Sequence, residues 1–443
     1  MTSMPLAGCE AGRDAADRAT IFKVVASSFI GNTIEFYDFL VYGLAAALVF
    51  GKLFFPNSTP LAAVLASFAT FGVGFVARPL GGIFFGHLGD TVGRKTTLVI
   101  TLVGMGAATA AIGLLPTYDQ VGVLAPALLV VLRFLQGFAV GGEWGGAMLM
   151  VVENAPANRR GFLSAWPQTG GFSGQLLATG AFALVGLLPE DQLIAWGWRI
   201  PFLASAILVI FGLYLRSRLD ETIVFKETHA APDRDRRPPF FQLVQHSWRS
   251  LLLIMVLRFA ESVPFFLVTV FAVSYATGQL GVNKQTLLGV IMVTCVIAFP
   301  MHGLFGAISD RVGRRPVYIF GALMAAVSAF PFFYLLETGN FLLIVLGYVM
   351  LINIAHNSIN AVQPAFFTEL FGPKVRYSGA SIGHQLGAIA AGGATPFIAK
   401  SLSAADNNGW TLVAAYVVVG ALVAAVAAYF GPETSRRDLS KTP

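Results

Sequence analysis

The sequence has little charge and almost no cysteine. Asp, Glu, Lys and Arg make up 12% of its 443 residues, about half the share that is usual in soluble domains, so a soluble globular domain is excluded. The two cysteines, Cys9 and Cys295, show no paired spacing, so no disulfide framework can be inferred. A Walker loop, zinc-ligand spacing and a Ser/His/Asp motif are also missing, which argues against an enzyme, a metal site or an organic cofactor.

What the sequence does have is long apolar runs. Its residues are 56% hydrophobic, with 38 Phe and 47 Gly, and its mean hydropathy is +0.71. About 20 apolar residues cross the hydrocarbon core of a bilayer as one helix. The runs predict twelve such helices, at residues 22–50, 60–86, 96–115, 121–152, 161–188, 198–216, 249–277, 286–306, 316–336, 341–368, 378–402 and 410–430. We therefore expect an all-α membrane protein with twelve transmembrane helices.

The basic residues indicate which way these helices cross. A net charge of +6 would suit a nucleic-acid binder, but the charges lie in short loops between apolar runs, which excludes nucleic acid as a partner. Loops on the same side of the membrane as the N-terminus hold most of the Lys and Arg. Loops on the other side hold only Lys52, Arg199, Lys284 and Lys400. Because cationic loops resist translocation, both termini are expected in the cytoplasm. The N-terminus has no apolar segment before a small-residue cleavage site, so no signal peptide is expected there.

Three short patterns occur twice, in the same order and in corresponding loops. The three pairs are Gly86–Lys95 with Gly306–Arg315, Glu153–Gly161 with Glu369–Gly379, and Asp220–Thr222 with Pro432–Thr434. One short match arises easily by chance, whereas three in register do not. Parallel repeats of this kind are typical of transporters, whose substrate site lies between the two halves near the bilayer midplane.

The repeat and a polar central stretch together predict how the chain is divided. The central stretch carries Pro232, Pro238, Pro239 and many charges, as a linker does. The predicted segments are a cytoplasmic tail (1–22), a six-helix bundle (23–218), a cytoplasmic linker (219–248), a second six-helix bundle (249–431) and a cytoplasmic tail (432–443). The two bundles are expected to be pseudo-symmetric.

With these motifs the chain resembles the major facilitator superfamily, whose signature is the doubled Gly-x-x-x-Asp-x-x-Gly-Arg-Arg/Lys loop. More narrowly, residues 24–434 resemble the bacterial metabolite:proton symporter family. The motifs that carry the narrower resemblance are Gly31–Asp38, Phe75–Gly82, Arg133–Gly137, Gly141–Glu143, Thr368–Phe371 and Val375–Gly379. The resemblance implies the major facilitator fold and proton-coupled symport of a small organic solute by alternating access.

The cargo is less well defined by the sequence. Ser164–Gln168 and Trp196–Pro201 are similar to the shikimate-transporter branch of that family, which implies shikimate or a related carboxylate. Two positions depart from the family pattern: Phe36 stands where Trp is usual, and Thr91 stands where a basic residue is usual, which implies a looser clamp in the first signature loop. The alternatives are dicarboxylates such as 2-oxoglutarate and citrate, betaine or proline osmolytes, and a uniporter or exporter.

Ionisable side chains inside a membrane span are functional candidates, because each costs about 2.5–3.5 kcal/mol on insertion scales. Glu35 and Asp38 are three residues apart and share a helix face. Arg258 and Glu261 have the same spacing, and they could equally form a static ion pair that joins helices. Glu143 lies in a glycine-rich stretch where close packing is an alternative role. The predicted proton-coupling residues are Glu35, Asp38, Glu143, Arg258 and Glu261.

Arg133 is the predicted partner of a substrate carboxylate, because guanidinium is permanently charged and binds carboxylates through two hydrogen bonds. A carboxylic acid that takes up a proton when Arg133 changes partner would couple the two movements. His356 belongs to a polar stripe at helical spacing, and a neutral hydrogen-bonded histidine is an alternative there. The other predicted substrate-binding residues are Asn32, Tyr42, Gln136, Trp144, Trp166, Gln168, Gln175, Asn353, His356, Asn357 and Asn360.

The duplicated loops predict a gate. Asp90 and Asp310 lie beside glycines and close to Arg94 and Arg314, so either carboxylate can cap a helix N-terminus or hold an Arg. A role in topology alone would explain the basic residues but not the repeated Gly and Asp spacing. The predicted gating residues are Arg78, Asp90, Arg94, Glu153, Asp310, Arg311, Arg314 and Glu369.

These observations predict a monomeric transporter in the bacterial cytoplasmic (inner) membrane. Its expected partners are the lipid bilayer and a small organic acid, with the proton as coupling ion and with neither a cofactor nor a metal.

Overall fold

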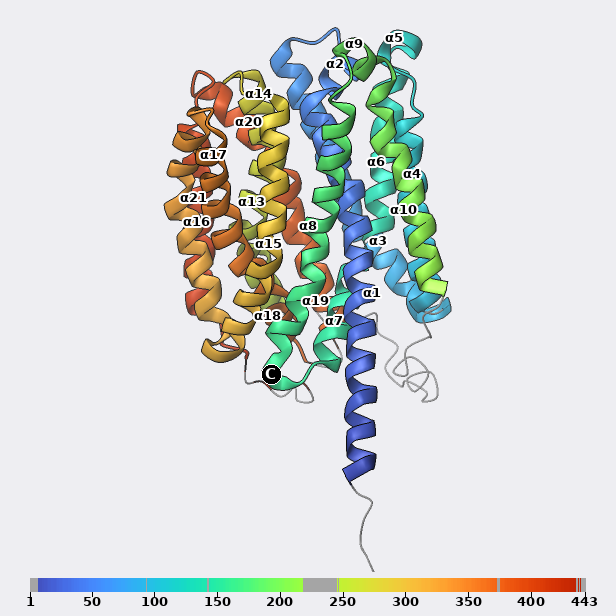
Figure 1. Cartoon of the computed structure of the whole chain (residues 1–443), viewed down its shortest axis with the longest axis vertical. Helices are drawn as coiled ribbons and strands as arrows, with labels where there is room; N and C mark the ends of the chain where they lie inside the picture. The colour runs from blue at the N-terminus through green and yellow to red at the C-terminus, as the bar shows by residue number, and fades with distance from the viewer. Residues whose placement is uncertain are drawn as a thin grey trace, which may run out of the picture.

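The protein is built of helices that run side by side along one axis (Figure 1). The computed structural model describes residues 7–92, 94–141, 143–217, 245, 247–372, 375–435, 437 and 439, and every regular element in these ranges is a helix. Helix α1 begins beyond the ends of the other helices, and the C-terminus lies at the same end of the molecule (Figure 1). We call this end the basal end and the other the distal end.

The N-terminal half supplies the helices that match the first six predicted spans. In chain order these are α1 (Ala7–Leu48), α3 (Pro60–Val92), α4 (Arg94–Gly113), α6 (Leu124–Val140) continued by α7 (Glu143–Asn154), α8 (Arg160–Val185) and α10 (Arg199–Ser217). Short helices connect them: α2 (Phe50–Phe54), α5 (Tyr118–Val121), η1 (Ala157–Arg159), α9 (Glu190–Gln192) and η2 (Leu193–Gly197).

The C-terminal half matches the other six spans, and three of these contain a π-helical segment. The first is α13 (Trp248–Phe266), the π-helix η3 (Leu267–Phe271) and α14 (Ala272–Gly278); α15 (Lys284–Val312) and α16 (Arg314–Glu337) follow. The last three are α17 (Phe341–Tyr348) with the π-helix η4 (Val349–His356) and α18 (Asn357–Glu369), then α19 (Arg376–Ala388) with the π-helix η5 (Ile389–Gly393) and α20 (Thr395–Ala405), and finally α21 (Thr411–Phe430). Such segments often accompany functional sites because they re-aim the side chains that follow.

Helix contacts repeat between the halves as the sequence repeat predicts. In the N-terminal half α1 packs on α8, α3 on α6, and α4 on α10. The corresponding contacts in the C-terminal half are α13 on α19, α15 on α18, and α16 on α21. The halves meet where α8 lies along α15 and α18, where α3 lies along α19 and η5, and where α1 lies along η3.

The apolar surface fits a lipid environment. Among the described residues, seven helices are long and apolar enough to cross a membrane, and the pair Glu190–Gly197 and Arg199–Tyr214, bent by 44°, counts as an eighth. Helices α1 and α8 are not among these, because they carry polar side chains that face inward: Asn32, Asp38 and Gln175 are all buried. The hydropathy of these two spans is lowered by side chains that lipid never meets.

Most predicted boundaries lie close to the observed ones, although α3 and α15 run past their predicted ends to Val92 and Val312, and two larger differences occur. Helix α1 begins at Ala7 instead of residue 22, because a helix can extend past the apolar run into polar sequence. The span predicted at 121–152 is two helices, because α6 ends at Val140 and α7 begins at Glu143. The predicted linker at 219–248 and the C-terminal tail lie largely outside the described residues, so their boundaries remain predictions.

Close packing of α3 on α6 places the arginines of these two helices. A Cβ atom at Gly137 would lie 1.9 Å from the carbonyl oxygen of Gly74, and one at Gly141 would lie 1.9 Å from that of Arg78. Only glycine allows the two backbones to approach so closely. The crossing therefore fixes Arg78 and Arg133 on neighbouring turns of the same bundle.

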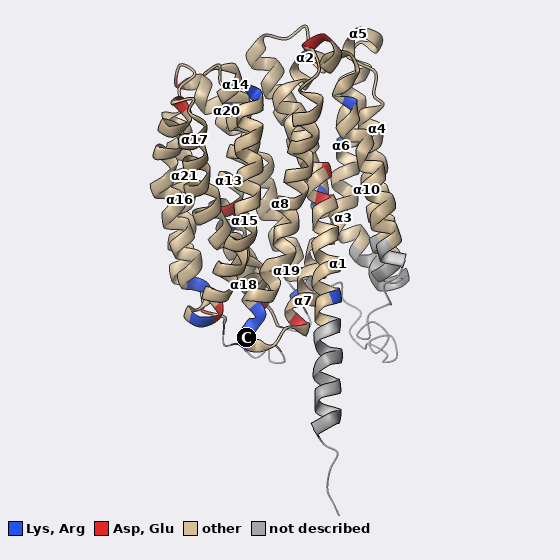
Figure 2. Ribbon diagram, in the orientation of Figure 1, with Lys and Arg blue, Asp and Glu red and all other residues tan. Residues whose placement is uncertain are grey.

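Charged residues lie mainly at the ends of the described helices, and few lie along their middle (Figure 2). The exceptions near the middle are fully enclosed: Glu35, Asp38, Arg133, Arg258 and Glu261 are each at most 6% exposed. Groups of this kind need partners inside the protein.

Candidate functional site

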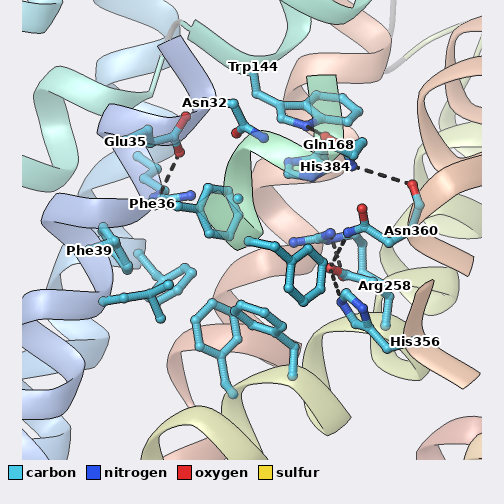
Figure 3. A pocket seen from close by; sticks show the side chains of 18 residues that line it. Asn32, Glu35, Phe36, Phe39, Trp144, Gln168, Arg258, His356, Asn360 and His384 are labelled. Atoms are coloured by element: carbon cyan, nitrogen blue, oxygen red, sulfur yellow. Dashed lines mark hydrogen bonds and ion pairs between the residues drawn. The ribbon is translucent and has the colours of Figure 1, made fainter. Parts of the chain in front are cut away.

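A pocket lies between the two halves, and Figure 3 shows its lining side chains. The N-terminal half contributes Asn32, Glu35, Phe36, Phe39, Leu40, Phe75, Arg78, Trp144, Gln168, Gly171 and Phe172. The C-terminal half contributes Arg258, Glu261, Phe265, Phe266, His356, Asn360 and His384. The structure therefore brings together many of the predicted substrate-binding and proton-coupling residues from both halves at one place.

One ion pair of the pocket lies in the N-terminal half. Arg78 Nη2 on α3 is 3.4 Å from Glu35 Oε1 on α1. The guanidinium carbon of Arg78 also lies 4.1 Å from the ring centroid of Phe39 and 4.8 Å from that of Phe75. Both rings therefore make cation–π contacts with this arginine. Arg78, predicted as a gating residue, thus lines the pocket.

A second ion pair lies in the C-terminal half and has more hydrogen bonds. Arg258 Nη1 is 2.5 Å from Glu261 Oε2, and the same nitrogen is 3.2 Å from Gln363 Oε1. Ser262 donates to Glu261 Oε2 at 2.7 Å, and Asn360 donates to Glu261 Oε1 at 3.2 Å. The spacing of three residues predicted that Arg258 and Glu261 share a face, and the structure joins them directly.

Three histidines lie in or beside the pocket. His356 Nε2 is 3.4 Å from Glu261 Oε1, and His302 Nε2 on α15 is 3.1 Å from Asn360 Oδ1. His384 on α19 stacks on the indole of Trp144, with ring centroids 3.7 Å apart and planes 13° apart. Since Trp144 belongs to the N-terminal half and His384 to the C-terminal half, this stack joins the two halves (Figure 3).

Phenylalanines close the pocket toward the distal end. Phe265 packs edge-on against Phe36 and Phe172 at centroid distances of 6.1 and 6.0 Å. Phe266 packs against Phe71 at 5.7 Å and Phe75 at 5.1 Å. Every one of these pairs joins the two halves. We call Phe36, Phe71, Phe75, Phe172, Phe265 and Phe266 the aromatic layer.

Arg133 does not line the pocket. Its guanidinium carbon lies 3.8 Å from the ring centroid of Phe39 and 4.2 Å from that of Tyr42, and the side chain is fully buried. Its Nη1 donates to Gln136 Oε1 at 2.5 Å, and its other nitrogens reach the carbonyl of Phe71 at 3.4 Å. The ring of Phe39 contacts both Arg78 and Arg133, and it separates Arg133 from the pocket. The pocket-facing arginines are Arg78 and Arg258.

Asp38 lies behind the pocket as well. Its Oδ1 accepts a 2.5 Å hydrogen bond from Ser205 on α10. Gln136 Nε2 is 3.3 Å from the carbonyl oxygen of Asp38 and 2.7 Å from the hydroxyl of Thr109. This predicted proton-coupling residue is therefore part of a polar network inside the N-terminal half, which also includes Gln136 and Arg133.

The remaining predicted residues lie at several places. Asn32 lines the pocket and donates to the carbonyl of Pro167 at 2.8 Å. Tyr42 donates to Thr70 at 2.7 Å. Five further predicted residues do not line the pocket, and two of them, Gln175 and Glu143, are buried elsewhere. Asn353 donates to the carbonyl of Thr294 at 3.2 Å, and Asn357 contacts His356. Trp166 lies near Gly303 of α15.

At the basal end the second signature loop holds the halves together. Asp310 at the end of α15 accepts from the backbone N–H groups of Gly161 and Phe162 at 2.8 and 2.9 Å, so it caps α8 of the other half. Arg314 Nη1 lies 2.8 Å from Asp310 Oδ1. Arg376 and Glu153 form a second contact between the halves at 3.5 Å.

Other predicted gating residues surround this contact. Glu369 accepts from the Thr434 hydroxyl at 2.7 Å and lies 3.5 Å from Arg314 Nε. Arg311 is exposed at the end of α15. The side chains of Asp90 and Arg94 lie outside the described part of the structure, so the gate predicted in the first signature loop remains a prediction.

Sequence reasoning missed His384, His302 and the aromatic layer. The two histidines lie inside predicted spans, and the criterion that selected Glu35 and Arg258 would have selected them too. The phenylalanines gave no such signal, because Phe is common throughout the apolar runs of this chain, with 38 in all.

Comparison with known proteins connects this pocket to transporters. The chain is 43% identical to the shikimate transporter of Escherichia coli over 417 residues, which cover 94% of this chain and 95% of that protein. It is 34% identical over 432 residues to the glycine betaine/proline/ectoine/pipecolic acid transporter OusA of Dickeya dadantii, covering 96% and 85%. Both relatives are transporters and neither is an enzyme.

Solved structures show the same fold. The xylose transporter XylE of E. coli, in a partially occluded inward open conformation, superimposes with a TM-score of 0.73 over 95% of this chain and 99% of that one, at 20% identity. Residues 29–383 and 304–443 match the Major Facilitator Superfamily. The chain is a multi-pass membrane protein with the twelve-helix fold, and it is a secondary transporter. It belongs to the major facilitator superfamily.

Proposed function

We propose that this transporter takes up a small hydroxylated organic acid such as shikimate together with protons. The observation that carries the proposal is the pocket between the halves, which contains two arginines that each face a glutamate. The similarity to the shikimate transporter over nearly the whole chain supports the same substrate class. Arg258, instead of the predicted Arg133, is then the group that holds the carboxylate, because its guanidinium faces the pocket.

The charges of the pocket support coupling to protons. Glu35, Arg78, Arg258 and Glu261 are each at most 6% exposed, and as two ion pairs their formal charges cancel. A carboxylate that enters adds one negative charge, and an uncompensated buried charge costs several kcal/mol. A proton that enters with the acid restores neutrality. Of the predicted proton-coupling residues, Glu35 and Glu261 lie where they can respond to the substrate directly.

Alternating access requires contacts between the halves to break in turn. At the distal side the aromatic layer closes the pocket, and at the basal side Asp310 and Arg376 join the halves. We propose that the basal end faces the cytoplasm of a bacterium and that the protein works as a monomer in the inner membrane. Arg159, Arg160, Arg314 and Arg315 at that end fit the rule for cytoplasmic loops.

A betaine or proline carrier is the second candidate. Six phenylalanines line the pocket, and aromatic faces attract quaternary ammonium groups. One relative carries the name of a betaine and proline transporter. A dicarboxylate such as 2-oxoglutarate or citrate would instead use both pocket arginines, one for each carboxylate.

Uptake into proteoliposomes tests the proposal. The labelled compounds are shikimate, 2-oxoglutarate, citrate, glycine betaine and proline, each with and without an acidic exterior. We expect shikimate to accumulate only when the exterior is acidic and a protonophore to abolish the accumulation. Uptake of betaine alone, or shikimate flux that only equilibrates as in a uniporter, would contradict the proposal.

A further inference from the structure

His356 occupies an unusual position next to the substrate pocket. It is the last residue of the π-helical η4, directly before α18, and its ring is 1% exposed. The ring stacks on Phe265 with centroids 5.1 Å apart and meets Phe172 edge-on at 5.8 Å. Both rings belong to the aromatic layer, and they fix the plane in which the imidazole lies. Its two nitrogens therefore point at defined partners.

These partners can accommodate two charge states of the imidazole. Nε2 faces Glu261 Oε1 at 3.4 Å, and Nδ1 faces Asn357 Oδ1 at 2.9 Å. Both partners are acceptors, so this arrangement is complete when both ring nitrogens carry hydrogen. Asn357 Nδ2 has no hydrogen-bond partner among the described residues. A rotation of this amide presents Nδ2 to Nδ1 and satisfies a neutral ring that still donates from Nε2 to Glu261.

Glu261 lies between two cationic candidates. Its Oε2 is 2.5 Å from Arg258, and its Oε1 faces His356. When Arg258 turns to a substrate carboxylate, Glu261 loses its permanent positive partner inside a closed pocket. A buried carboxylate left in this way is strongly destabilising. A positive charge on His356 replaces the lost partner without any movement of the backbone.

We propose that His356 takes up the proton that accompanies the substrate, and that the charged imidazole holds Glu261 while Arg258 holds the substrate carboxylate. This rests on the proposed function and adds where the proton sits. Before binding, Arg258 and Glu261 cancel and His356 is neutral. After binding, the positive charge of Arg258 cancels that of the substrate carboxylate, and the positive charge of His356 cancels that of Glu261. One proton from the solution binds at Nδ1 for each carboxylate, and the pocket stays neutral.

Other charged and titratable groups surround His356. Arg258 and Glu261 face it from α13, and Tyr318 on α16 donates to the backbone of Leu257 on the same helix. His302 on α15 reaches Glu261 only through Asn360. Across the pocket lie His384, with Glu35 and Arg78 of the N-terminal half. Among the titratable side chains of the described residues, only His356 contacts Glu261 Oε1 directly, so it alone can replace the charge of Arg258.

The test compares His356→Gln with His302→Gln in the purified full-length protein, with shikimate as the probe. Proton uptake on binding is read from a pH indicator in weakly buffered solution, and the Kd is measured over a range of pH. In the wild type we expect about one proton per bound shikimate and a Kd that rises with pH, by up to about tenfold per pH unit. His356→Gln should bind with a Kd that is flat within about twofold and take up no proton. His302→Gln should still take up about one proton per bound shikimate, because His302 reaches Glu261 only through Asn360.

The outcomes separate this proposal from the proposed function. If the wild type binds shikimate without proton uptake, or does not bind it, the proposed function fails. If the wild type and His356→Gln both take up about one proton, or if only His302→Gln loses it, the assignment to His356 is wrong. Should His356→Gln fail to fold, ¹⁵N NMR of histidine-labelled wild type decides. Saturation with shikimate must convert one neutral imidazole signal to the imidazolium form, and unchanged signals would overturn the proposal.

Discussion

The two ion pairs of the pocket have the same residue types but are held in different ways. Arg78 is 3.4 Å from Glu35 and rests on the faces of Phe39 and Phe75. Arg258 is 2.5 Å from Glu261, which also accepts hydrogen bonds from Ser262 and Asn360. Aromatic faces attract a guanidinium without fixing its direction, whereas a hydrogen-bonded carboxylate fixes both partners. The C-terminal pair is therefore the one with a defined set of alternative partners, and the N-terminal pair is the more tolerant of change.

The largest expected effect separates the two arginines. Arg258→Gln leaves Glu261 buried without its permanent partner and removes the proposed carboxylate ligand, so kcat/KM for shikimate should fall by at least about 100-fold. Arg78→Gln should lower it by about tenfold, since the lost contacts are weaker. Initial uptake rates, normalised to the amount of folded protein in the membrane, measure both. Equal losses would show that the two pairs are equivalent.

The next effect concerns stability. The double variant Arg258→Gln/Glu261→Gln removes both buried charges, whereas Arg258→Gln removes one. We expect the double variant to be more stable than the single variant by about 2–3 kcal/mol, because no uncompensated charge remains. Thermal unfolding in detergent measures this difference, and neither variant should transport. A double variant that is no more stable than Arg258→Gln would mean that Glu261 already finds another partner.

Phe39 allows the N-terminal pair to be weakened without changing a charge. Its ring lies against the guanidinium groups of both Arg78 and Arg133, and each contact is worth about 0.5–2 kcal/mol. Phe39→Leu should therefore raise the KM for shikimate about fivefold with little change in protein yield. The matched control is Phe320→Leu, whose ring is 45% exposed on the outer surface of α16. If the two variants behave alike, the aromatic contacts to the arginines do not matter for binding.

Glu433 extends the comparison to a carboxylate held mainly by backbone groups outside the membrane. Burial raises its pKa, but the N–H groups of Ser435, Arg314 and Arg315 outweigh this and hold the pKa below the usual value of 4.5. Since the folded pKa is the lower one, the stabilisation is complete above about pH 4.5 and is lost as the pH falls through the folded value. Glu433→Gln should cost about 1 kcal/mol or less at neutral pH. The difference from the wild type should shrink below pH 4.5 in thermal unfolding, and a constant difference would contradict this account.

The fold followed closely from the sequence, because lipid imposes a simple rule on length and hydropathy. Each of the twelve predicted spans corresponds to one helix or to consecutive helices. The π-helical segments η3, η4 and η5 could not be predicted, since they depend on how neighbouring helices pack and not on local composition. The extension of α1 to Ala7 escaped prediction for a related reason: a helix outside lipid needs no apolar residues.

The site was less predictable, because hydropathy does not tell which way a helix is rotated. Arg133 and Arg258 look alike in the sequence, since both are arginines near the middle of a span. Close packing of α6 on α3 turns Arg133 toward Phe39 and Tyr42, whereas α13 turns Arg258 into the pocket. The spacing of Arg258 and Glu261 was informative because it is local. Contacts between helices, such as the stack of His384 on Trp144, have no local signature.

The aromatic layer has an electrical consequence. Its phenyl rings offer no lone pairs and no hydrogen-bond donors, so a file of water molecules cannot form through it while the halves are in contact. Protons move rapidly along such files and would dissipate the proton gradient that we propose as the driving force for accumulation. The contacts between rings of the two halves thus hinder proton leakage through the closed carrier.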